Sequence, residues 1–394
     1  MNTLAIKLKI KAEKIVKKGH PWVFSQSISK QNTKGVAGDI AILFGQHDNE
    51  VYAIGLYDPH SPVRIKIIHR GKGVQIDAQF FQQKIARAFQ IRVPLLQKDT
   101  NAYRLLFGEN DGFPGMIVDI YNQVGVLKLY SEIWLPYLPM ITPALVHAAG
   151  IESLVLRLSR NLQKQPITYQ EGSVLYGNLK DPEVLFTEHG VHFKTHVILG
   201  HKTGFFLDHR DNRHRIGSLS KGKTVLDVFS YAGGFSIHAL AGGAKEVTCI
   251  DFSMQALALA KTNARLNPHS GIFNTLSGDA FTLLKELHKK GKTYDIVIID
   301  PPSLAKSKSE KDIAKRKYAE LARLGVALTK RKGILLLASC SSRITTTAFL
   351  EIHQREFAQL GVEYQTLAFT EHDLDHPVTF KEGAYLKSVF YKID

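Results

Sequence analysis

Two hydrophobic runs in the second half of the chain each end in chemically reactive side chains. The run 295–299 leads into Asp300-Pro-Pro-Ser303, and the run 333–338 leads into Ser339-Cys-Ser341. Between them lie a lysine-rich loop and a helix-like segment, residues 311–330. A short apolar strand, a helix and a second apolar strand predict a βαβ unit with parallel strands. Because ligands bind at the carboxyl edge of such sheets, we expect Asp300 and Cys340 to face one crevice.

The same alternation of strand and helix patterns extends over residues 191–394. It predicts a doubly wound parallel sheet, since successive βα units build sheets of that kind. The expected strands are 224–229, 246–251 and 273–276, and the expected helices are 234–242, 253–267 and 280–289.

The first half of the chain has a different pattern. Short runs of period-two alternation, beginning with residues 7–11 and separated by Gly, Pro and Asp, predict a small β-barrel. Farther along, helical patterns at 77–89 and 137–149 accompany strand patterns at 116–121 and 124–130, which predicts a central α+β domain. The expected fold class is α/β, with domains at 1–72, 73–190 and 191–394.

Composition and charge narrow the function. The 394 residues carry 51 basic and 36 acidic side chains, a formal charge of +15, which favours a polyanionic partner such as nucleic acid. We find no run of about 18 apolar residues and no apolar core of a secretory signal at the N-terminus, so no membrane partner is expected. The two cysteines, Cys249 and Cys340, suggest no disulfide framework and a cytoplasmic protein.

Lysines gather in two places where RNA could bind. One group surrounds Trp22 near the N-terminus, and the other follows the Asp-Pro-Pro turn as a basic loop. A solvated surface is the competing interpretation for both groups. The predicted RNA-binding residues are Lys9, Lys11, Lys14, Lys17, Lys18, Trp22, Lys306 and Lys308.

Acidic residues at three successive strand ends point to a nucleoside cofactor. The segment 225–235 ends a strand and turns through glycines into a helix, but its spacing does not match the dinucleotide fingerprint G-x-G-x-x-G. Asp251 ends the next strand, where a carboxylate suits ribose hydroxyls, and Asp279 ends the third, where it could meet an adenine amino group. With Asp300-Pro-Pro they describe the S-adenosylmethionine pocket of a class I methyltransferase, although each acid alone could be a helix cap.

Motifs spread over nearly the full length strengthen this interpretation. They are Gly19-His-Pro-Trp-Val-Phe-Ser25, Gly108-Glu-Asn-Asp-Gly-Phe-Pro-Gly115, Gly204-Phe-Phe-Leu-Asp-His-Arg-Asp-Asn-Arg213, Asp227-Val-Phe-Ser-Tyr-Ala-Gly-Gly-Phe235, Asp300-Pro-Pro-Ser303, Ser339-Cys-Ser341, His376-Pro-Val and Glu382-Gly-Ala-Tyr-Leu-Lys387. As a set they resemble the bacterial large-subunit (23S) ribosomal RNA cytosine-C5 methyltransferases that carry a leading PUA domain.

The resemblance implies a PUA β-barrel, a central α+β domain and a C-terminal Rossmann-like methyltransferase domain. It also implies that Asp208 and Arg210 lie near the cofactor. Members of this family usually have glutamine at the position of His209. The predicted cofactor-binding residues are Asp208, Arg210, Asp227, Phe229, Ser230, Tyr231, Gly233, Gly234, Asp251, Phe252, Asp279, Ala280, Asp300 and Pro301.

The chemistry of cytosine agrees with a thiol beside an acid. Carbon 5 is a weak nucleophile until a thiolate adds to carbon 6, which assigns that role to Cys340, while Asp300 could meet ring nitrogen 3. We therefore expect S-adenosylmethionine-dependent formation of 5-methylcytidine on a single-stranded or flipped base, with no metal. Methylation of another RNA atom such as a guanine nitrogen, a non-catalytic RNA-binding assembly factor, and a homodimer all stay open.

Overall fold

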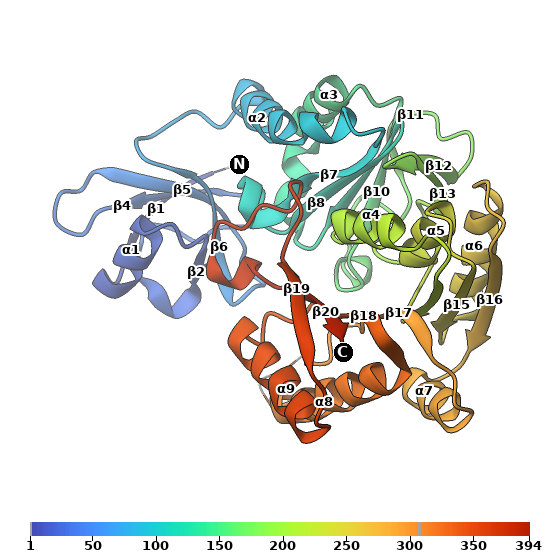
Figure 1. Cartoon of the computed structure of the whole chain (residues 1–394). Helices are drawn as coiled ribbons and strands as arrows, with labels where there is room; N and C mark the ends of the chain where they lie inside the picture. Colours follow the sequence, from blue (N-terminus) through green and yellow to red (C-terminus); the bar gives the residue numbers. More distant parts are fainter. Residues whose placement is uncertain (1, 306, 308) are drawn as a thin grey trace. The chain divides into compact units, whose positions relative to one another are not determined.

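A computed structural model describes every residue except 1, 306 and 308 (Figure 1). The chain forms two compact units, each made of discontinuous segments. Unit 1 comprises residues 1–186, 195–207 and 374–383, and unit 2 comprises residues 187–194, 208–373 and 384–394. No helix in the described part of the chain is both long and apolar enough to cross a membrane.

Unit 1 begins with a six-stranded sheet in the order β2-β6-β5-β4-β1-β3. Its strands are β1 (Thr3–Leu8), β2 (Trp22–Phe24), β3 (Ile28–Gln31), β4 (Ile40–Phe44), β5 (Val51–Tyr57) and β6 (Val63–Arg70). The strand predicted over residues 7–11 ends at Leu8, and helix α1 (Ile10–Lys17) follows it. The alternation was misleading because Glu13 and Val16, at helical spacing, turn inward while Lys11, Lys14 and Lys17 stay exposed.

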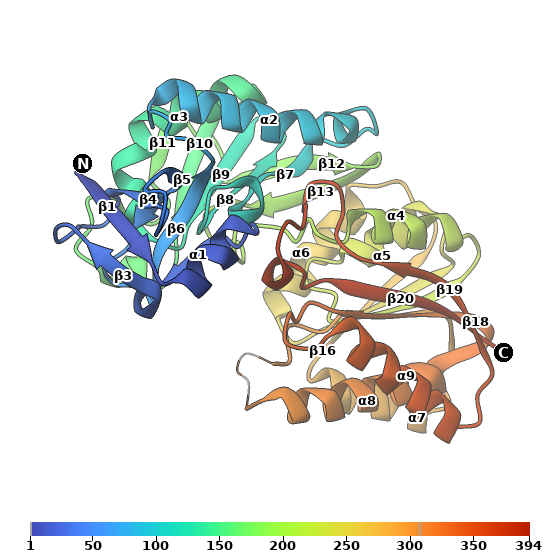
Figure 2. The same cartoon turned by 90° about the vertical axis from the view of Figure 1, so that its left-hand side faces the viewer.

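A second sheet of unit 1 has the order β11-β10-β9-β8-β7. Its strands are β7 (Ala102–Phe107), β8 (Met116–Tyr121), β9 (Val124–Leu129), β10 (Ser153–Leu158) and β11 (Val174–Gly177). Helices α2 (Ala78–Leu96) and α3 (Leu138–Ala149) lie side by side over this sheet (Figure 2). As predicted, Asp77 caps α2, accepting a 2.9 Å bond from the Phe80 amide, but the helix continues to Leu96.

The core of unit 1 joins its two sheets. Trp134, Phe81 and Tyr137 are fully buried between α2, α3 and the second sheet, and Leu56 and Ile68 of the first sheet belong to the same cluster. A hairpin of β12 (Glu183–Glu188) and β13 (Val191–His196) follows in the chain. The division into domains at residues 72 and 190 remains our proposal, supported by the separate sheets on either side of residue 72.

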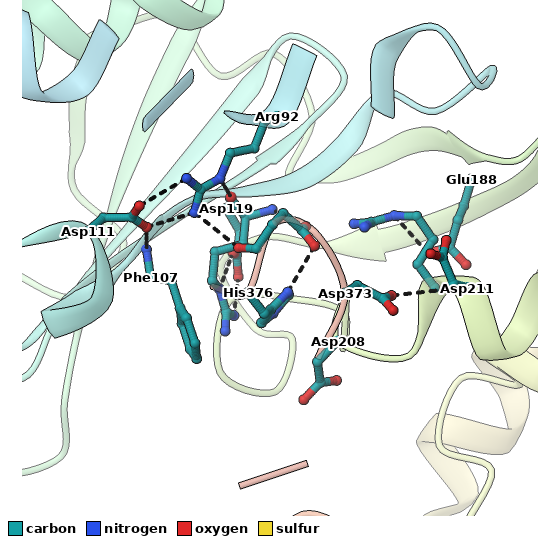
Figure 3. Close-up of polar contacts among 12 residues, drawn as sticks. Arg92, Phe107, Asp111, Asp119, Glu188, Asp208, Asp211, Asp373 and His376 are labelled. Carbon is teal, nitrogen blue, oxygen red and sulfur yellow. Dashed lines mark hydrogen bonds and ion pairs between the residues drawn. The ribbon is translucent and has the colours of Figure 1, made fainter. Parts of the chain in front are cut away.

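A buried ion pair ties the segment 374–383 into unit 1. The Arg92 guanidinium donates to both carboxylate oxygens of Asp111 at 2.9 and 2.6 Å, and also to the backbone carbonyls of Arg104 and Asp375 (Figure 3). The Asp375 carboxylate in turn accepts from the Arg104 amide and lies 2.9 Å from Nδ1 of His376. Asp111 is thus a structural anchor of unit 1.

Unit 2 is built on a seven-stranded sheet in the order β16-β15-β14-β17-β18-β20-β19. Its strands are β14 (Thr224–Val228), β15 (Glu246–Asp251), β16 (Ile272–Ser277), β17 (Tyr294–Ile299), β18 (Thr329–Ser339), β19 (Tyr364–Thr370) and β20 (Lys387–Ile393). The predicted parallel pairing holds from β16 to β18, but β20 runs antiparallel to both its neighbours, so the sheet is mixed. The sequence missed this because β19 and β20 are joined by a chain segment that enters unit 1.

Helices cover both faces of this sheet. Helices α4 (Arg210–Leu219), α5 (Gly234–Ala241) and α6 (Met254–Arg265) form one layer, and α7 (Ala280–Lys289), α8 (Lys311–Leu328) and α9 (Thr346–Gln359) form the other (Figure 2). The predicted helices agree with α5, α6, α7 and α8 to within two residues at each end. Helices on both faces leave only the strand ends open to a ligand.

We expect Arg92→Met to destabilise unit 1 by about 3–5 kcal/mol, because it leaves the Asp111 carboxylate buried without its cation. The matched control is Arg87→Met on the same helix, where the side chain is exposed and the cost should stay within about 0.5 kcal/mol. Both tryptophans, Trp22 and Trp134, lie in unit 1, so urea unfolding followed by tryptophan fluorescence reports on this unit. Equal midpoints for the two variants would contradict the anchoring role.

Candidate active site

The carboxyl ends of five neighbouring strands bring the predicted chemistry to one edge of the unit 2 sheet. In sheet order they are followed by Asp279, Asp251, the turn 229–233, Asp300 and Cys340. The registers Asp251↔Ser277 and Val228↔Ile299 keep the ends of β14 to β17 level, and β18 continues two residues beyond Leu337, the partner of Ile299. Neighbouring strands lie about 4.8 Å apart, and Asp300 and Cys340 follow adjacent strands at the same edge of the sheet.

The turn after β14 is held in an unusual backbone conformation. Phe229 and Tyr231 have φ values of 64° and 48°, and Gly233 has a φ of 79°. The Tyr231 amide donates to Oδ2 of Asp251 at 2.8 Å, and the Ser230 amide donates to the Ile250 carbonyl at 3.0 Å. Left-handed residues of this kind persist only where neighbours hold them, and they cluster at ligand sites.

The exposed end of β15 fits the adenosine part of a cofactor. The Asp251 carboxylate is tied by the amides of Tyr231 and Ser253, each at 2.8 Å, which orients it for hydroxyl groups. The next side chain, Phe252, is 81% exposed, so its ring is accessible to a ligand. Asp279 caps α7 through its Oδ1, and the first residues of α5 and α7 are Gly234 and Ala280.

Asp227 differs from the other strand-end acids because it is buried. Its Oδ2 accepts from the amide and the hydroxyl of Ser236, at 3.1 and 2.7 Å, while Oδ1 has no hydrogen-bond partner in the described structure. Burial raises the pKa of Asp227 to about 7, the Ser236 bonds oppose this, and the charges of Asp300 and Asp251 add to it. The sheet edge therefore carries one acid that is neutral in weakly acidic solution.

His209 pairs with Asp300. Its Nε2 lies 3.3 Å from Oδ2 of Asp300, an ion-pair contact too poorly aligned to count as a hydrogen bond. Nδ2 of Asn212 faces Nδ1 at 3.0 Å, so Nδ1 accepts from this amide and Nε2 carries the proton on the side of Asp300. Burial alone would lower the pKa of His209, but the carboxylates of Asp300 and Asp208 raise it above its usual value. The histidine thus orients and partly neutralises the predicted catalytic acid.

Asp208 and Arg210, the residues implied by resemblance, have different surroundings. Asp208 accepts a 2.8 Å bond from the Tyr385 hydroxyl. Arg210 is fully buried, with Nε 4.0 Å from Oε2 of Glu188. Arg213 donates twice to Glu188 at 2.7 Å and, against the effect of burial, holds the pKa of that carboxyl well below its usual range. Arg210 thus belongs to a buried charge cluster, and its contact with the cofactor stays a prediction.

Cys340 is partly exposed at the end of β18. Its Sγ lies 3.6 Å from the carbonyl oxygen of Pro301, directly after Asp300. The preceding residue, Ser339, is fixed by a 2.8 Å hydrogen bond between its hydroxyl and that of Tyr318. Cys249, in contrast, is fully buried beside Ser236.

The predicted RNA-binding residues fall into three situations. Lys9, Lys11, Lys14, Lys17 and Lys18 are all exposed on or beside α1, so they form a basic helix surface and not a barrel face. Trp22 donates from Nε1 to Glu109 at 3.0 Å and packs edge-on against Phe380, which gives it a structural role in unit 1. Lys306 and Lys308 lie outside the described residues.

Sequence reasoning missed two polar groups at this edge. One is the pairing of His209 with Asp300. The sequence had shown only that histidine stands at a position where the family usually has glutamine. The other is Lys387, which appeared only as the last residue of a motif and lies opposite Ser339 on β20. No local pattern announces either contact, because the partners are 91 and 46–48 residues apart in the chain.

Acids at successive strand ends around a glycine turn define a nucleotide-binding α/β domain. Comparison with known proteins makes this more specific. Residues 173–382 match the family model of S-adenosylmethionine-dependent methyltransferases, and residues 6–70 match the PUA-like domain.

Curated relatives cover the whole chain. A ribosomal RNA large subunit methyltransferase of Deinococcus radiodurans is 40% identical over 399 residues, spanning 99% of this chain and 98% of that protein. Ribosomal RNA large subunit methyltransferase I of Aeromonas salmonicida is 34% identical, spanning 96% of both chains. A solved methyltransferase complexed with S-adenosylhomocysteine has the same fold, with a TM-score of 0.83, 23% identity and full coverage of both chains.

The chain therefore belongs to the family of S-adenosylmethionine-dependent methyltransferases that includes the ribosomal RNA large subunit methyltransferases. Its cofactor is S-adenosylmethionine. The oriented Asp251 carboxylate, the exposed Phe252 ring and the glycine turn fit the adenosine and amino-acid parts of this molecule.

The burial of Asp227 predicts a pH-dependent stability. Because the pKa of about 7 in the folded protein exceeds the usual value of 3.8, folding takes up a proton between these limits, and stability falls as pH rises through them. Asp227→Asn removes this dependence, so its free energy of unfolding relative to wild type should rise by up to roughly 3 kcal/mol between about pH 5 and pH 8. Hydrogen exchange of the β14 amides measures it, and a difference that does not vary with pH would contradict it.

The contact with His209 makes a second prediction. Asp300→Asn should lower the pKa of His209, because the carboxylate that opposes burial is lost. In the wild type, the raised pKa of His209 stabilises the folded protein below the usual histidine pKa, and this stabilisation is lost as the pH rises through the pKa in the folded state. The Asp300→Asn variant should lack this pH-dependent stabilisation. NMR titration of labelled histidine measures this, with His209→Gln identifying the signal among the 17 histidines. An unchanged titration would show that the two groups do not interact.

Proposed function

We propose that this protein methylates carbon 5 of a cytosine in large-subunit ribosomal RNA. Two curated relatives named for ribosomal RNA large subunit methylation, matched over 96–99% of the chain, support the RNA substrate. The formal charge of +15 and the exposed lysines on α1 agree with a polyanionic partner.

A single observation carries the choice of atom. The Cys340 sulfur lies 3.6 Å from the Pro301 carbonyl, so a thiol and the Asp300 carboxylate flank one position at the end of neighbouring strands. Methylation of an amino nitrogen needs no thiol, whereas cytosine carbon 5 must be activated by a nucleophile at carbon 6. Among the described residues, Cys340 is the thiol with access to solvent.

The residues then act in order. The Cys340 thiolate forms a bond from Sγ to carbon 6, and the electron density displaced from the ring double bond becomes available at carbon 5. Asp300, oriented by His209, meets ring nitrogen 3 and stabilises the charge that develops on the ring. Bound S-adenosylmethionine supplies an electrophilic methyl group for carbon 5. Loss of the carbon 5 proton and cleavage of the Sγ–carbon 6 bond restore the aromatic ring and the thiolate.

The cofactor would lie over the other half of the sheet edge. Asp251 would hold the ribose hydroxyls, Phe252 would cover the adenine, and Asp279 would face its amino group. The turn 229–233 would approach the amino-acid part, because glycine removes side chains there. A target base must leave its stack to reach Cys340, so single-stranded or flipped RNA is the expected substrate.

The experiment compares the two cysteines. Cys340→Ser should abolish turnover, Asp300→Asn should lower it by about 10²–10⁴-fold, and Cys249→Ala should retain it. Mass spectrometry of ribosomal RNA from a deletion strain complemented with each variant detects the 5-methylcytidine. Product formation by Cys340→Ser would instead favour methylation of another atom, such as a guanine nitrogen. Failure of the protein to bind S-adenosylmethionine in calorimetry would favour a non-catalytic RNA-binding factor.

A further inference from the structure

Lys387 is a buried cation next to the predicted nucleophile. It is only 3% exposed, although lysine is among the residues least often buried. It is the first residue of β20 and pairs with Ser339, the residue before Cys340. Its Nζ donates to the carbonyl of Ser341, the residue after Cys340, at 2.7 Å, and to the carbonyl of Tyr385 at 3.0 Å. The ammonium group thus contacts the backbone just after the end of β18 and just before the start of β20.

The charge of Lys387 is not cancelled by a direct ion pair. In the described part of the chain, Nζ contacts two peptide carbonyls and no carboxylate. Burial lowers the pKa of Lys387 to about 8, while Cys340 and the more distant Glu371 oppose this. At neutral pH the side chain is therefore mainly an ammonium group, and a negative charge nearby would relieve the cost of its burial.

Two other described titratable groups lie near Cys340 and are not cations facing its sulfur. Tyr318 on α8 faces both Cys340 and Asp300, and burial raises the pKa of its hydroxyl, so it stays neutral. Asp300 at the end of β17 carries negative charge, which disfavours a thiolate, and its partner His209 is directed toward the carboxylate. Lys387, in contrast, carries a charge that suits an ionised sulfur.

We propose that the Lys387 ammonium group stabilises the thiolate form of Cys340 and so sets the fraction of nucleophile present at neutral pH. Cys340 loses its S–H proton to water, its sulfur electron pair forms the bond to the substrate carbon, and Lys387 keeps its three protons throughout. A cation beside a thiol has this effect generally. Lys387 is a positioning residue by this account, and its part in turnover rests on the proposed function.

Alkylation of Cys340 in the free protein tests the inference without RNA or cofactor. The full-length chain is treated with iodoacetamide from about pH 5.5 to 9.5, and the Cys340 peptide is quantified by mass spectrometry; buried Cys249 serves as the unreactive internal reference. Lys387→Met should slow alkylation near pH 7 by about 10-fold and move its pH midpoint upward. Lys387→Arg, which keeps the charge, should restore most of the wild-type rate.

Two further variants separate charge from structure. Lys387→Gln keeps a donor for the Ser341 carbonyl but removes the charge, so it should behave like Lys387→Met even if the methionine variant folds poorly. Lys392→Met removes a half-buried lysine five residues farther along β20, opposite Ile334, and this variant should be alkylated like wild type. Unchanged alkylation in a folded Lys387→Gln protein, or an equal loss in Lys392→Met, would overturn the inference.

The two proposals fail separately. Slow alkylation of the Lys387→Gln variant together with an active Cys340→Ser variant would support the effect of Lys387 on the thiol and contradict the proposed cytosine mechanism. Normal alkylation of the Lys387→Gln variant together with an inactive Cys340→Ser variant would support Cys340 as the nucleophile and contradict the role of Lys387.

Discussion

The parallel pairing of β17 with β18 is the constraint on which the candidate site depends. Its register, Ile299 opposite Leu337, brings the residues that follow each strand to the same edge. A slip of one residue would reverse which side chains face each helix layer, and the buried Leu335, Leu337 and Ile299 forbid it. The hydrophobic core of unit 2 thus fixes the positions of Asp300 and Cys340 before any polar contact is made.

Charge at this edge is distributed by surroundings and not by residue type. Asp227 is buried and its pKa is raised, Asp251 accepts hydrogen bonds from two backbone amides, and Asp300 faces a histidine. Three carboxylates within neighbouring strand ends would repel one another if all were alike. Their different partners give the acids different charge environments, which suits the proposed ribose and base contacts, and Lys387 would add the opposite charge beside the thiol.

The last strands of unit 2 are separated in the chain by a segment that belongs to unit 1. Residues 374–383 leave unit 2, are fixed in unit 1 by Arg92, Arg104 and Asp375, and return to unit 2 as β20. That return places Lys387 antiparallel to β18 and opposite Ser339. β20, which carries the buried lysine, is thus the first strand after the segment 374–383.

The sequence by itself determined the βα alternation, the parallel strands β14 to β18 and the arrival of Asp251, Asp279, Asp300 and Cys340 at one edge, because hydrophobic periodicity and strand polarity are local properties. It mistook the period of residues 7–11, where the inward side of α1 is set by packing on the first sheet. Only the tertiary structure decided that Trp22 packs against Phe380, that Asp227 is buried, that His209 meets Asp300 and that Lys387 lies beside the thiol. These contacts join residues distant in the chain, and burial and long-range pairing arise only when the sheet, its helices and the returning strand are packed together.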